Sequence, residues 1–400
     1  MAQGRLLVLN QYYWPRPEAD GQLLSQLCEG LALEWDVTVV TGAADGVRSG
    51  RSWRRGVEVI RVPSTTFSRR HLAMRGLNYG SFTVLAAARG IAVRPPDIVL
   101  AYSNPPFLGG LAYGLARRFR APLVVGVQDV FPETAVALGR ASDGLLLDAL
   151  RAAVSFYLQR ADRIVAIGDT MRRRLEEKGV PRERLRVIEN WVDTDEIGPR
   201  PQANAWSEAK AVAGRFVVMH SGNVGHAQDL DTFVEASALV ANLERTVFLV
   251  IGTGARRAEV EAHAARLHAP VRFLPFQPAD VLSESLSSAS VHVVGLARGL
   301  AGYVVPSRLY GVLAAGRPVI AAAEDESETA ALVRTVGCGV VVPPGDAEEL
   351  AAAISAAHRG DYDLEAMGRR GRDYVVREAS REAALSRYRA LLAEVRRSDS

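Results

Sequence analysis

Lysine and cysteine are the residues that this 400-residue sequence contains least of. There are two lysines, Lys178 and Lys210, and two cysteines, Cys28 and Cys338. The cysteines lie alone in their segments, so no spacing indicates a disulfide framework or a metal site, and we expect no bound metal. Unpaired thiols fit a reducing cytoplasm. Because almost every basic residue is arginine, we interpret the shortage of lysine as a coding bias.

Long apolar runs and a strong net charge are also missing. The apolar run after Arg5 is four residues long, too short for a signal peptide. The uncharged stretch 98–116 is broken by Ser103–Pro106, which predicts a strand, a turn and a helix and not a membrane span. The net charge is only +3, so binding to nucleic acid is not expected. The length suits two domains.

Short apolar runs alternate with amphipathic stretches along the chain. The runs predict strands at 5–10, 36–40, 57–62, 97–102, 122–127 and 163–168, and then at 215–220, 246–252, 271–276, 290–296, 317–323 and 339–344. Continuous apolar strands are typical of parallel sheets covered on both faces. Leu23, Leu24, Leu27 and Leu31 form one helical stripe. Segment 189–202 has turn formers and no periodicity, which indicates a linker. The pattern predicts an α/β chain of two Rossmann-like domains.

In such domains ligands bind beyond the carboxyl ends of the strands, and the cleft between two domains is the natural site. The stretch "HSGNVGHAQDLDTFVEA" (220–236) puts Ser221, Gly222 and Asn223 in a turn before a helix, an arrangement that suits phosphate. An ordinary turn is the alternative. The lone pair Gly252 and Gly254 is weak evidence for a dinucleotide site, and close strand–helix packing explains it better.

The stretch "VVPSRLYGVLAAGRPVI" (304–320) predicts a short helix that Ser307 caps and Gly316 ends. Arg308 then falls in the first turn, where a cation is unfavourable against the helix dipole. Its guanidinium either reaches solvent or shares an anion with the helix start, and a diphosphate has the charge and geometry for that role.

Two stretches of the first half carry further polar candidates. In "VVGVQDVFPETAVALG" (124–139), Asp129 and Glu133 follow a strand, where two carboxylates suit acid–base work or hydroxyl binding; a helix cap with a first-turn acid is the alternative. The first strand–helix turn, "NQYYWPRPEADGQ" (10–22), is long, and long turns in compact domains are often functional. Glu18, Asp20 and Gly21 lie there.

Arginines are concentrated in segment 48–75, which holds Arg48, Arg51, Arg54, Arg55, Arg61, Arg69, Arg70 and Arg75 against the single acid Glu58. With the apolar residues that follow, this segment could contact an anionic membrane. The alternative is a solvated arginine-rich face.

The motifs "YYWPRPEADGQ", "NPP", "VQDVFPETAVALG", "VIENWVD", "HSGNVGHAQDLDTFVEA", "FLPFQP", "VVPSRLYGVLAAGRPVI" and "GCGVVVPPGDAEELAAAI" occur in that order. Together they resemble glycosyltransferase family 4, in particular the bacterial surface-polysaccharide enzymes of the colanic-acid and O-antigen type. The resemblance implies a GT-B fold, with two Rossmann-like domains facing a cleft and a C-terminal helix returning to the first domain. It also implies transfer from a nucleotide diphosphate sugar with retention and without a metal.

The resemblance assigns roles to residues of this chain. The donor side comprises Gly21, Ser221, Gly222, Asn223, Gly252, Gly254, Phe276, Gln277, Ser307, Arg308 and Glu328. The catalytic candidates are Arg308, Asp129 and Glu133, and the acceptor side comprises Tyr13, Trp14, Glu18 and Asp20. Arg308 would stabilise the leaving diphosphate, Phe276 and Gln277 would lie near the base, and Asp129 would orient the acceptor hydroxyl.

The sequence departs from the family pattern at two places. The positions of two glutamates that many relatives carry are Tyr303 and Gly311 here, so Glu328 becomes the candidate for the ribose. The turn where relatives often carry an Arg/Lys pair holds His226 and Asp229. Arg308 must then bind more of the phosphate alone, or Arg298 or Arg256 must assist.

These observations predict an acceptor-binding domain at 1–198, with helix 380–400 packed back on it, and a donor-binding domain at 199–379. We expect a retaining transferase that acts on a polyprenyl-diphosphate-linked or other glycan acceptor, is cytoplasmic and contacts the inner face of the membrane. A two-lobed sugar-nucleotide-binding protein without catalysis and an NAD-dependent epimerase or dehydrogenase are the alternatives. The lack of an export signal and the weak Gly-x-Gly motif disfavour them.

Overall fold

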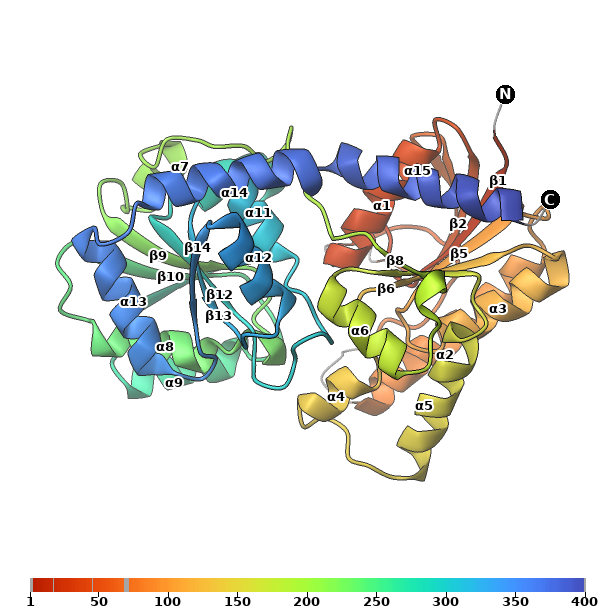
Figure 1. Cartoon of the computed structure of the whole chain (residues 1–400), viewed down its shortest axis with the longest axis horizontal. Helices are drawn as coiled ribbons and strands as arrows, with labels where there is room; N and C mark the ends of the chain where they lie inside the picture. Colours follow the sequence, from red (N-terminus) through yellow and green to blue (C-terminus); the bar gives the residue numbers. More distant parts are fainter. Residues whose placement is uncertain (1–2, 17, 45, 68–71, 399–400) are drawn as a thin grey trace. The chain divides into compact units, whose positions relative to one another are not determined.

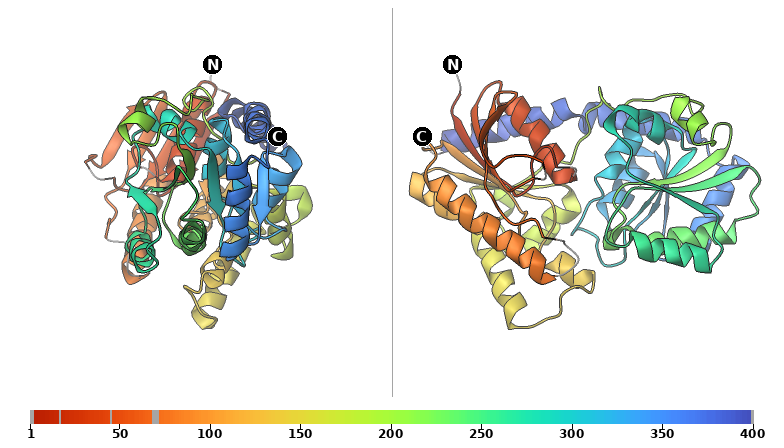
Figure 2. Two further views of the ribbon diagram at one scale, coloured as in Figure 1. Left: turned by 90° about the vertical axis from the view of Figure 1, so that its left-hand side faces the viewer. Right: turned by 180° about the vertical axis from the view of Figure 1, so that it is seen from behind.

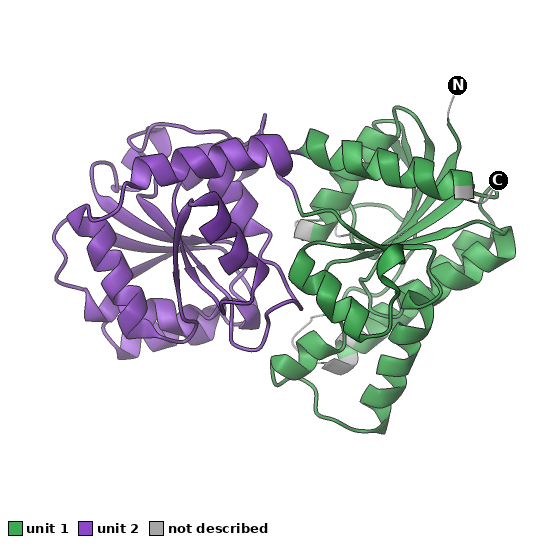
Figure 3. Cartoon of the chain, in the orientation of Figure 1, with its two compact units in different colours: residues 1–190, 381–400 green, residues 191–380 purple. Residues whose placement is uncertain are grey.

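The computed structural model describes residues 3–16, 18–44, 46–67 and 72–398. The chain divides into two compact units (Figure 3). Unit 1 combines residues 1–190 with 381–400, and unit 2 is the continuous segment 191–380. The C-terminal helix therefore belongs to the first unit, although a whole second unit precedes it in the chain.

Unit 1 is built on an eight-stranded sheet with the strand order β3-β4-β2-β1-β5-β6-β7-β8. The strands are β1 (Arg5–Leu9), β2 (Asp36–Thr41), β3 (Gly50–Arg54), β4 (Val57–Arg61), β5 (Ile98–Tyr102), β6 (Leu123–Val127), β7 (Arg163–Ala166) and β8 (Leu185–Val187). Only β3 pairs antiparallel, with β4. The central strands are apolar throughout and buried, as sheets covered on both faces require.

Helices cover both faces of this sheet (Figure 1; Figure 2, right). They are α1 (Ala19–Leu31), α2 (Leu72–Ile91), α3 (Leu108–Phe119), α4 (Glu133–Ala137), α5 (Leu145–Leu158), α6 (Asp169–Glu177) and α15 (Arg381–Ser398). Helix α15 packs on α1, whereas α2, α3 and α5 pack side by side. The leucine stripe predicted for 23–31 is the buried face of α1. The Tyr388 hydroxyl of α15 lies 3.1 Å from that of Tyr102, and both side chains are buried.

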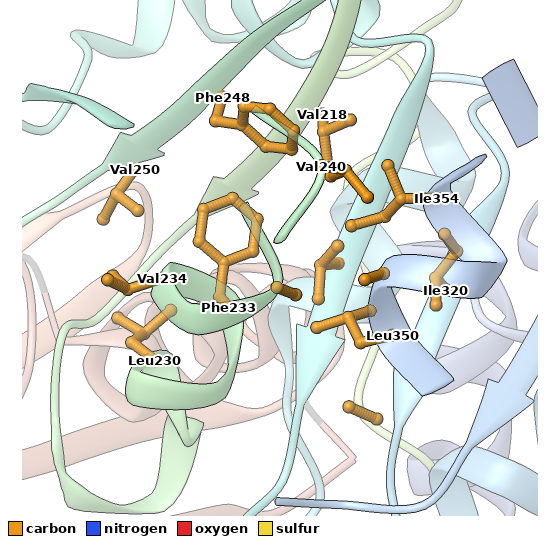
Figure 4. Close-up of a cluster of buried hydrophobic side chains, with 14 of the residues drawn as sticks. Val218, Leu230, Phe233, Val234, Val240, Phe248, Val250, Ile320, Leu350 and Ile354 are labelled. Atoms are coloured by element: carbon orange, nitrogen blue, oxygen red, sulfur yellow. The ribbon is translucent and has the colours of Figure 1, made fainter. Parts of the chain in front are cut away.

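Unit 2 has a six-stranded sheet whose paired strands are all parallel, in the order β11-β10-β9-β12-β13-β14. The strands are β9 (Phe216–Ser221), β10 (Thr246–Ile251), β11 (Val271–Leu274), β12 (Val291–Gly295), β13 (Val319–Ala322) and β14 (Gly339–Val342). The helices are α7 (Ala205–Ala209), α8 (Leu230–Leu239), α9 (Arg257–Arg266), α10 (Ala279–Ser287), α11 (Arg308–Ala314), α12 (Glu328–Val336), α13 (Ala347–Arg359) and α14 (Leu364–Glu378). The core between this sheet and helices α8 and α13 centres on Phe233 and Phe248, whose rings meet edge to face (Figure 4).

The twelve predicted strands are all present, and the two-domain α/β prediction is confirmed. Strands β3 and β8 were not predicted, because β3 is a polar edge strand and β8 has only three residues. The expected linker 189–202 is not free. Val192 and Ile197 pack in the core of unit 2, and Arg372 donates hydrogen bonds to the carbonyls of Thr194 and Ile197. The units therefore divide at 190/191 and not at 198/199.

Candidate functional site

The strand order of unit 2 reverses between β9 and β12. From β9 the chain proceeds outward to β10 and β11, and from β12 it proceeds the other way to β13 and β14. The connections that follow β9 and β12 therefore leave in opposite directions and open a crevice at the carboxyl ends of these strands, where parallel sheets bind ligands. The two connections touch there, since the Ala297 N–H donates to the Ala227 carbonyl over 3.0 Å.

The turn after β9 depends on three glycines. Gly222 has φ of +151°, which favours glycine, and its N–H bonds to the Ile251 carbonyl of β10. A Cβ on Gly252 would lie 1.8 Å from the Gly222 carbonyl oxygen, and a Cβ on Gly254 would lie 2.2 Å from that of Val224. Gly252 and Gly254 therefore let the turn after β10 pack against the turn after β9, a contact between two turns and not the strand–helix packing predicted for this pair.

Arg308 lies over this turn. It is the first residue of α11, and its Cδ would be 3.1 Å from a Cβ built on Gly222. Its Nη2 donates to the carbonyl of Gly295 at the end of β12, whereas its buried Nε has no partner. Burial lowers the pKa of the guanidinium to about 10, which leaves it charged at neutral pH. The side chain is half-buried and is held at the sheet edge by its hydrogen bond to the Gly295 carbonyl.

No described carboxylate pairs with Arg308. Helix α11 behind it contributes the buried Leu309, Val312 and Leu313, and Gly316 follows its end with φ of +68°, all as predicted. The predicted cap is wrong, because the Ser307 side chain makes no capping hydrogen bond. The backbone at Ser307 is already helical, with φ of −58° and ψ of −26°, and a capping side chain needs an extended backbone.

The two candidates for the base lie beyond the edge strand β11 and differ in their surroundings. The Phe276 ring is 51% exposed and available for stacking. The Gln277 side chain is committed to the fold, since its Oε1 accepts from the Trp206 indole over 2.7 Å and its Nε2 donates to the Pro275 carbonyl. Glu328 is the first residue of α12, half-buried, in the connection that follows β13.

Other polar residues considered for the phosphate are engaged elsewhere. Arg256 pairs with Asp231 at 2.8 Å and with Glu259 at 2.9 Å. Asp229 accepts from the Gly345 N–H and the Thr232 hydroxyl. The Nε of the exposed Arg298 donates to the Pro344 carbonyl. Arg308, by contrast, lies against Gly222 and keeps its Nε without a partner.

Sequence reasoning missed His220, which stands one residue before the turn. Its ring is fully buried on β9, beside the backbone of Asn223 and Val293. Burial, followed by the charge of Arg308, lowers its pKa well below the usual range, so the ring is neutral beneath the guanidinium. The polar residue that ends the apolar run 216–219 was the signal that could have found it.

Unit 1 has its own switch point between β1 and β5. In the connection after β1, Tyr13 is fully buried, and burial raises the pKa of its phenol. Trp14 is 44% exposed, and the Arg54 guanidinium stacks on its ring at 3.9 Å. Glu18 pairs with Arg16 at 3.2 Å. A Cβ on Gly21 would lie 3.2 Å from the Tyr12 carbonyl carbon, so Gly21 fits α1 beneath this connection.

Asp20 and Asp129 come from neighbouring connections of unit 1. Asp20 opens α1 and accepts from the Asn104 amide over 3.2 Å. Asp129 follows β6 and keeps a solvent-exposed surface. Loss of water around it, followed by the negative charge of Asp20, raises the pKa of Asp129 to about 7. Desolvation also raises the pKa of Asp20. Solvent contact screens part of the shift at Asp129, but its upward direction suits a group that takes up a proton near neutrality.

Glu133 does not join this carboxylate pair. Its Oε1 lies 2.5 Å from the Lys178 Nζ, and both side chains are largely buried. This ion pair ties α4 to the end of α6 and gives Glu133 a structural role. Tyr13 and Gly21 likewise serve the packing of unit 1, which leaves Asp129, Asp20, Trp14 and Glu18 as the predicted residues of this edge that are exposed or partly exposed.

The basic segment 48–75 is only partly a charged surface. Arg61 is 4% exposed and donates to the carbonyls of Gly42 and Trp14, so it cannot face a membrane. Arg54 and Arg55 both pair with Glu29, and Arg51 pairs with Glu58. Arg69 and Arg70 lie outside the described residues.

The described residues contain no cluster of His, Cys, Asp and Glu side chains that could hold a metal ion. None of the described helices has the length and apolarity needed to cross a bilayer. Cys28 and Cys338 are buried free thiols.

Both units match family models. Residues 21–191 match the glycosyl transferase 4-like domain, and residues 215–359 match the glycosyl transferases group 1 domain. A protein of Pseudomonas aeruginosa named as a glycosyltransferase, WbjE, is 31% identical over 304 residues, 74% of each chain. A protein of Escherichia coli (strain K12) named as a colanic acid biosynthesis glycosyl transferase, WcaI, is 29% identical over 321 residues, 76% of this chain and 75% of that one.

Solved structures agree on the fold. Sucrose-phosphate synthase from Thermosynechococcus elongatus superposes with a TM-score of 0.80 at 19% identity, covering 98% of this chain and 100% of that one. HepE from Anabaena, solved in complex with UDP-glucose, gives 0.75 at 16% identity over 98% of this chain and 100% of that one. The fold is therefore GT-B. The enzyme prediction is confirmed, and the binding-protein and NAD-dependent alternatives are set aside. The chain belongs to family 4 of the glycosyltransferases and is a glycosyltransferase of cell-surface polysaccharide synthesis.

Proposed function

We propose that this enzyme transfers a sugar, with retention, from a nucleotide diphosphate sugar to a lipid-linked glycan at the inner face of the cytoplasmic membrane. The carrying observation is Arg308, a charged guanidinium held over the Gly222 turn with an unused donor and no described carboxylate partner. An anion that bonds to this side chain and to the turn would satisfy both. HepE was solved with UDP and with UDP-glucose, which supports a nucleoside diphosphate sugar as the donor.

In the proposed reaction the bond between the anomeric carbon and the diphosphate oxygen breaks, and a bond from the acceptor hydroxyl oxygen forms on the same face of the sugar. Arg308 stabilises the negative charge that develops on the leaving nucleoside diphosphate. That oxygen takes up the hydroxyl proton. Because the guanidinium supplies the positive charge, we propose that the step needs no metal.

Unit 1 would receive the acceptor. Asp129 is the exposed carboxylate that follows β6, and its ionised form can accept a hydrogen bond from the acceptor hydroxyl and orient its oxygen. Asp20 accepts a hydrogen bond from Asn104 and would act indirectly, because its charge raises the pKa of Asp129. The exposed Trp14 ring offers an apolar face to a sugar.

The test compares two arginines at opposite ends of α11. Arg308→Ala should lower transfer, and the release of nucleoside diphosphate from UDP-sugars, by roughly 2–4 kcal/mol of transition-state stabilisation, or about thirtyfold to a thousandfold. Arg317→Ala is the matched control. Its guanidinium is also desolvated with a buried unpaired Nε, but it donates to the Arg200 carbonyl and precedes β13, so it lies at the opposite edge of the sheet.

Arg317→Ala should lower the melting temperature and leave turnover of the folded enzyme within a few-fold of the wild type. Near-normal turnover by Arg308→Ala would refute the assigned role. A panel of nucleotide sugars screened by thermal shift identifies the donor, because a bound ligand raises the melting temperature.

A further inference from the structure

Helix α2 carries an apolar stripe on its solvent side. Met74, Leu77, Val84, Ala88 and Ile91 are exposed, Leu77 by 53% and Val84 by 69%. Their spacing of three, seven, four and three residues places them on one face of the helix. The α2 stripe is defined here by these five residues. The opposite face is the packed one, because Asn78, Phe82 and Ala86 are buried. The stripe is therefore not part of the core of unit 1.

Neighbouring segments extend this apolar surface. Asn78 fixes the chain beside α2, since its side chain accepts from the Phe67 N–H and donates to the Phe67 carbonyl, both over 2.9 Å. The Phe67 ring is 48% exposed. Helix α5 begins with Leu145 and Leu146, the former 90% exposed, and packs on α3, which packs on α2 (Figure 2, right). One helical layer thus presents unpartnered apolar side chains at two places.

The part of this layer formed by α2 and α3 lacks negative charge, whereas α5 carries Asp148 paired with Arg151. Residues 62–128 contain eight arginines and a single acidic residue, Asp97. The Asp97 carboxylate accepts from the Arg5 backbone N–H and is committed there. The exposed arginines of the described part are Arg89, Arg94, Arg117, Arg118 and Arg120, at the ends of α2 and α3. None of these five pairs with a carboxylate of the described residues. The charge of α2 and α3 is therefore positive and uncompensated.

We propose that the α2 stripe docks on an anionic lipid bilayer. Apolar side chains would enter the interface while the arginines meet lipid headgroups, the combination by which amphipathic helices hold to membranes. A second copy of the chain fits less well, because it would bring two uncompensated positive surfaces together, whereas anionic lipid neutralises them. The inference rests on the proposed function, in that a lipid-linked acceptor requires the enzyme to reach a membrane, and it names the surface that does so.

This assignment moves the membrane contact along the chain. Among the arginines first considered, Arg51, Arg54 and Arg55 pair with acids, and Arg61 is buried. The attraction instead comes from residues after 62, a segment that holds both the α2 stripe and the unpaired arginines. Both features are needed, because a helix that lacks the charge or lacks the apolar area binds a membrane surface weakly.

The test is sedimentation with vesicles of phosphatidylcholine, with and without phosphatidylglycerol. The stripe variant Leu77→Gln/Val84→Gln replaces exposed side chains, so its melting temperature should equal that of the wild type. The wild type should sediment with the anionic vesicles and be released by salt, and the stripe variant should bind roughly tenfold less. The charge variant Arg117→Gln/Arg118→Gln should weaken binding to anionic vesicles in the same direction.

The matched control is Leu239→Gln/Leu267→Gln, which removes two exposed leucines from unit 2 and should bind vesicles like the wild type. Release of nucleoside diphosphate from UDP-sugars without vesicles should be the same in all four proteins, so a failed membrane proposal is distinguishable from a failed transferase proposal. Equal sedimentation of the stripe variant and the wild type would overturn the inference. So would equal binding of the wild type to neutral vesicles, or a dimer in light scattering that the stripe variant loses.

Discussion

The Arg308 side chain lies against Gly222 on the side where any other residue would carry a Cβ. A Cβ on Gly222 would lie 3.1 Å from the Arg308 Cδ, so the guanidinium reaches the Gly295 carbonyl by crossing directly over a glycine. The turn after β9, the end of β12 and the start of α11 therefore meet in one place, with the neutral His220 beneath them. A substitution at Gly222 should therefore shift the Arg308 side chain.

Gly222→Ala tests this contact. The left-handed φ of +151° costs roughly 1–2 kcal/mol for alanine, and the new methyl group displaces the Arg308 side chain. We expect a lower melting temperature together with weaker binding of the nucleotide sugar, measured by calorimetry. Gly114→Ala in α3 is the control, since nothing lies near its Cβ and alanine should stabilise the helix by about 0.5–1 kcal/mol. Unchanged binding of the nucleotide sugar by Gly222→Ala would show that the turn after β9 is not part of the donor site.

The pH dependence of transfer should report on Asp129. Its pKa is raised to about 7, and its ionised form is the one that accepts from the hydroxyl, so the rate should increase with pH through neutrality. Asp129→Asn cannot ionise and should lose this rise along with most of the activity. A wild-type profile flat from pH 5 to 9 would contradict the assignment.

The same group makes stability depend on pH. Because the pKa is higher in the folded chain than the roughly 3.9 of an unfolded aspartate, the folded state is favoured at low pH, and this advantage is lost as the pH rises through about 7. Asp129→Asn should therefore melt like the wild type near pH 4 and at a higher temperature near pH 8. The difference should be smaller than the full shift implies, because the side chain contacts solvent. A melting temperature for Asp129→Asn below that of the wild type at pH 8 would contradict a raised pKa for Asp129.

Glu133 and Lys178 form a pair suited to a double-mutant cycle. Glu133→Gln leaves a largely buried ammonium without its carboxylate and should destabilise unit 1 by about 1–3 kcal/mol. Lys178→Met added to it should recover most of that loss and normal transfer. If the double variant regains stability but stays inactive, Glu133 takes part in the reaction after all.

Substitution of Phe276 should affect donor binding, whereas substitution of Gln277 should affect the stability of the fold. Phe276→Ala removes a half-exposed ring and should weaken donor binding about tenfold, as loss of base stacking does, at an unchanged melting temperature. Gln277→Ala removes the acceptor of the Trp206 indole N–H and should cost about 1 kcal/mol of stability. The opposite pattern in calorimetry and thermal melting would exchange the two roles.

The parallel strands could be predicted because a strand buried on both faces must be apolar along its whole length. "LVVGV" in β6 and "VHVVG" in β12 carry that signal themselves. The antiparallel edge strand β3, "GRSWR", is held by backbone pairing with β4 and is exposed almost throughout, so no apolar pattern marks it. Segment 191–197 looked like a linker because its contacts are carbonyls bonded to a distant arginine, Arg372.

The residue types of the site could be predicted from the sequence, but the contacts between those residues could not. Arg308 at the start of a helix was conspicuous because the dipole opposes it. That its guanidinium would lie on Gly222 and Gly295 depends on strand order, which a local pattern does not contain. Likewise, Lys178 lies 45 residues from Glu133, so only the fold could show that this carboxylate is neutralised.

The assignment of α15 to unit 1 makes unit 2 an insertion within a discontinuous domain. The chain leaves unit 1 after Asn190 and returns at Arg381, and the Val192 N–H bonds to the Ala379 carbonyl over 3.0 Å, so both passages lie side by side. Arg396 of α15 donates to the carbonyl of Gln3, which brings the two ends of unit 1 together. Such a topology lends itself to grafting, because a different module could be exchanged for unit 2 at the adjacent pair of junctions without cutting the sheet of unit 1.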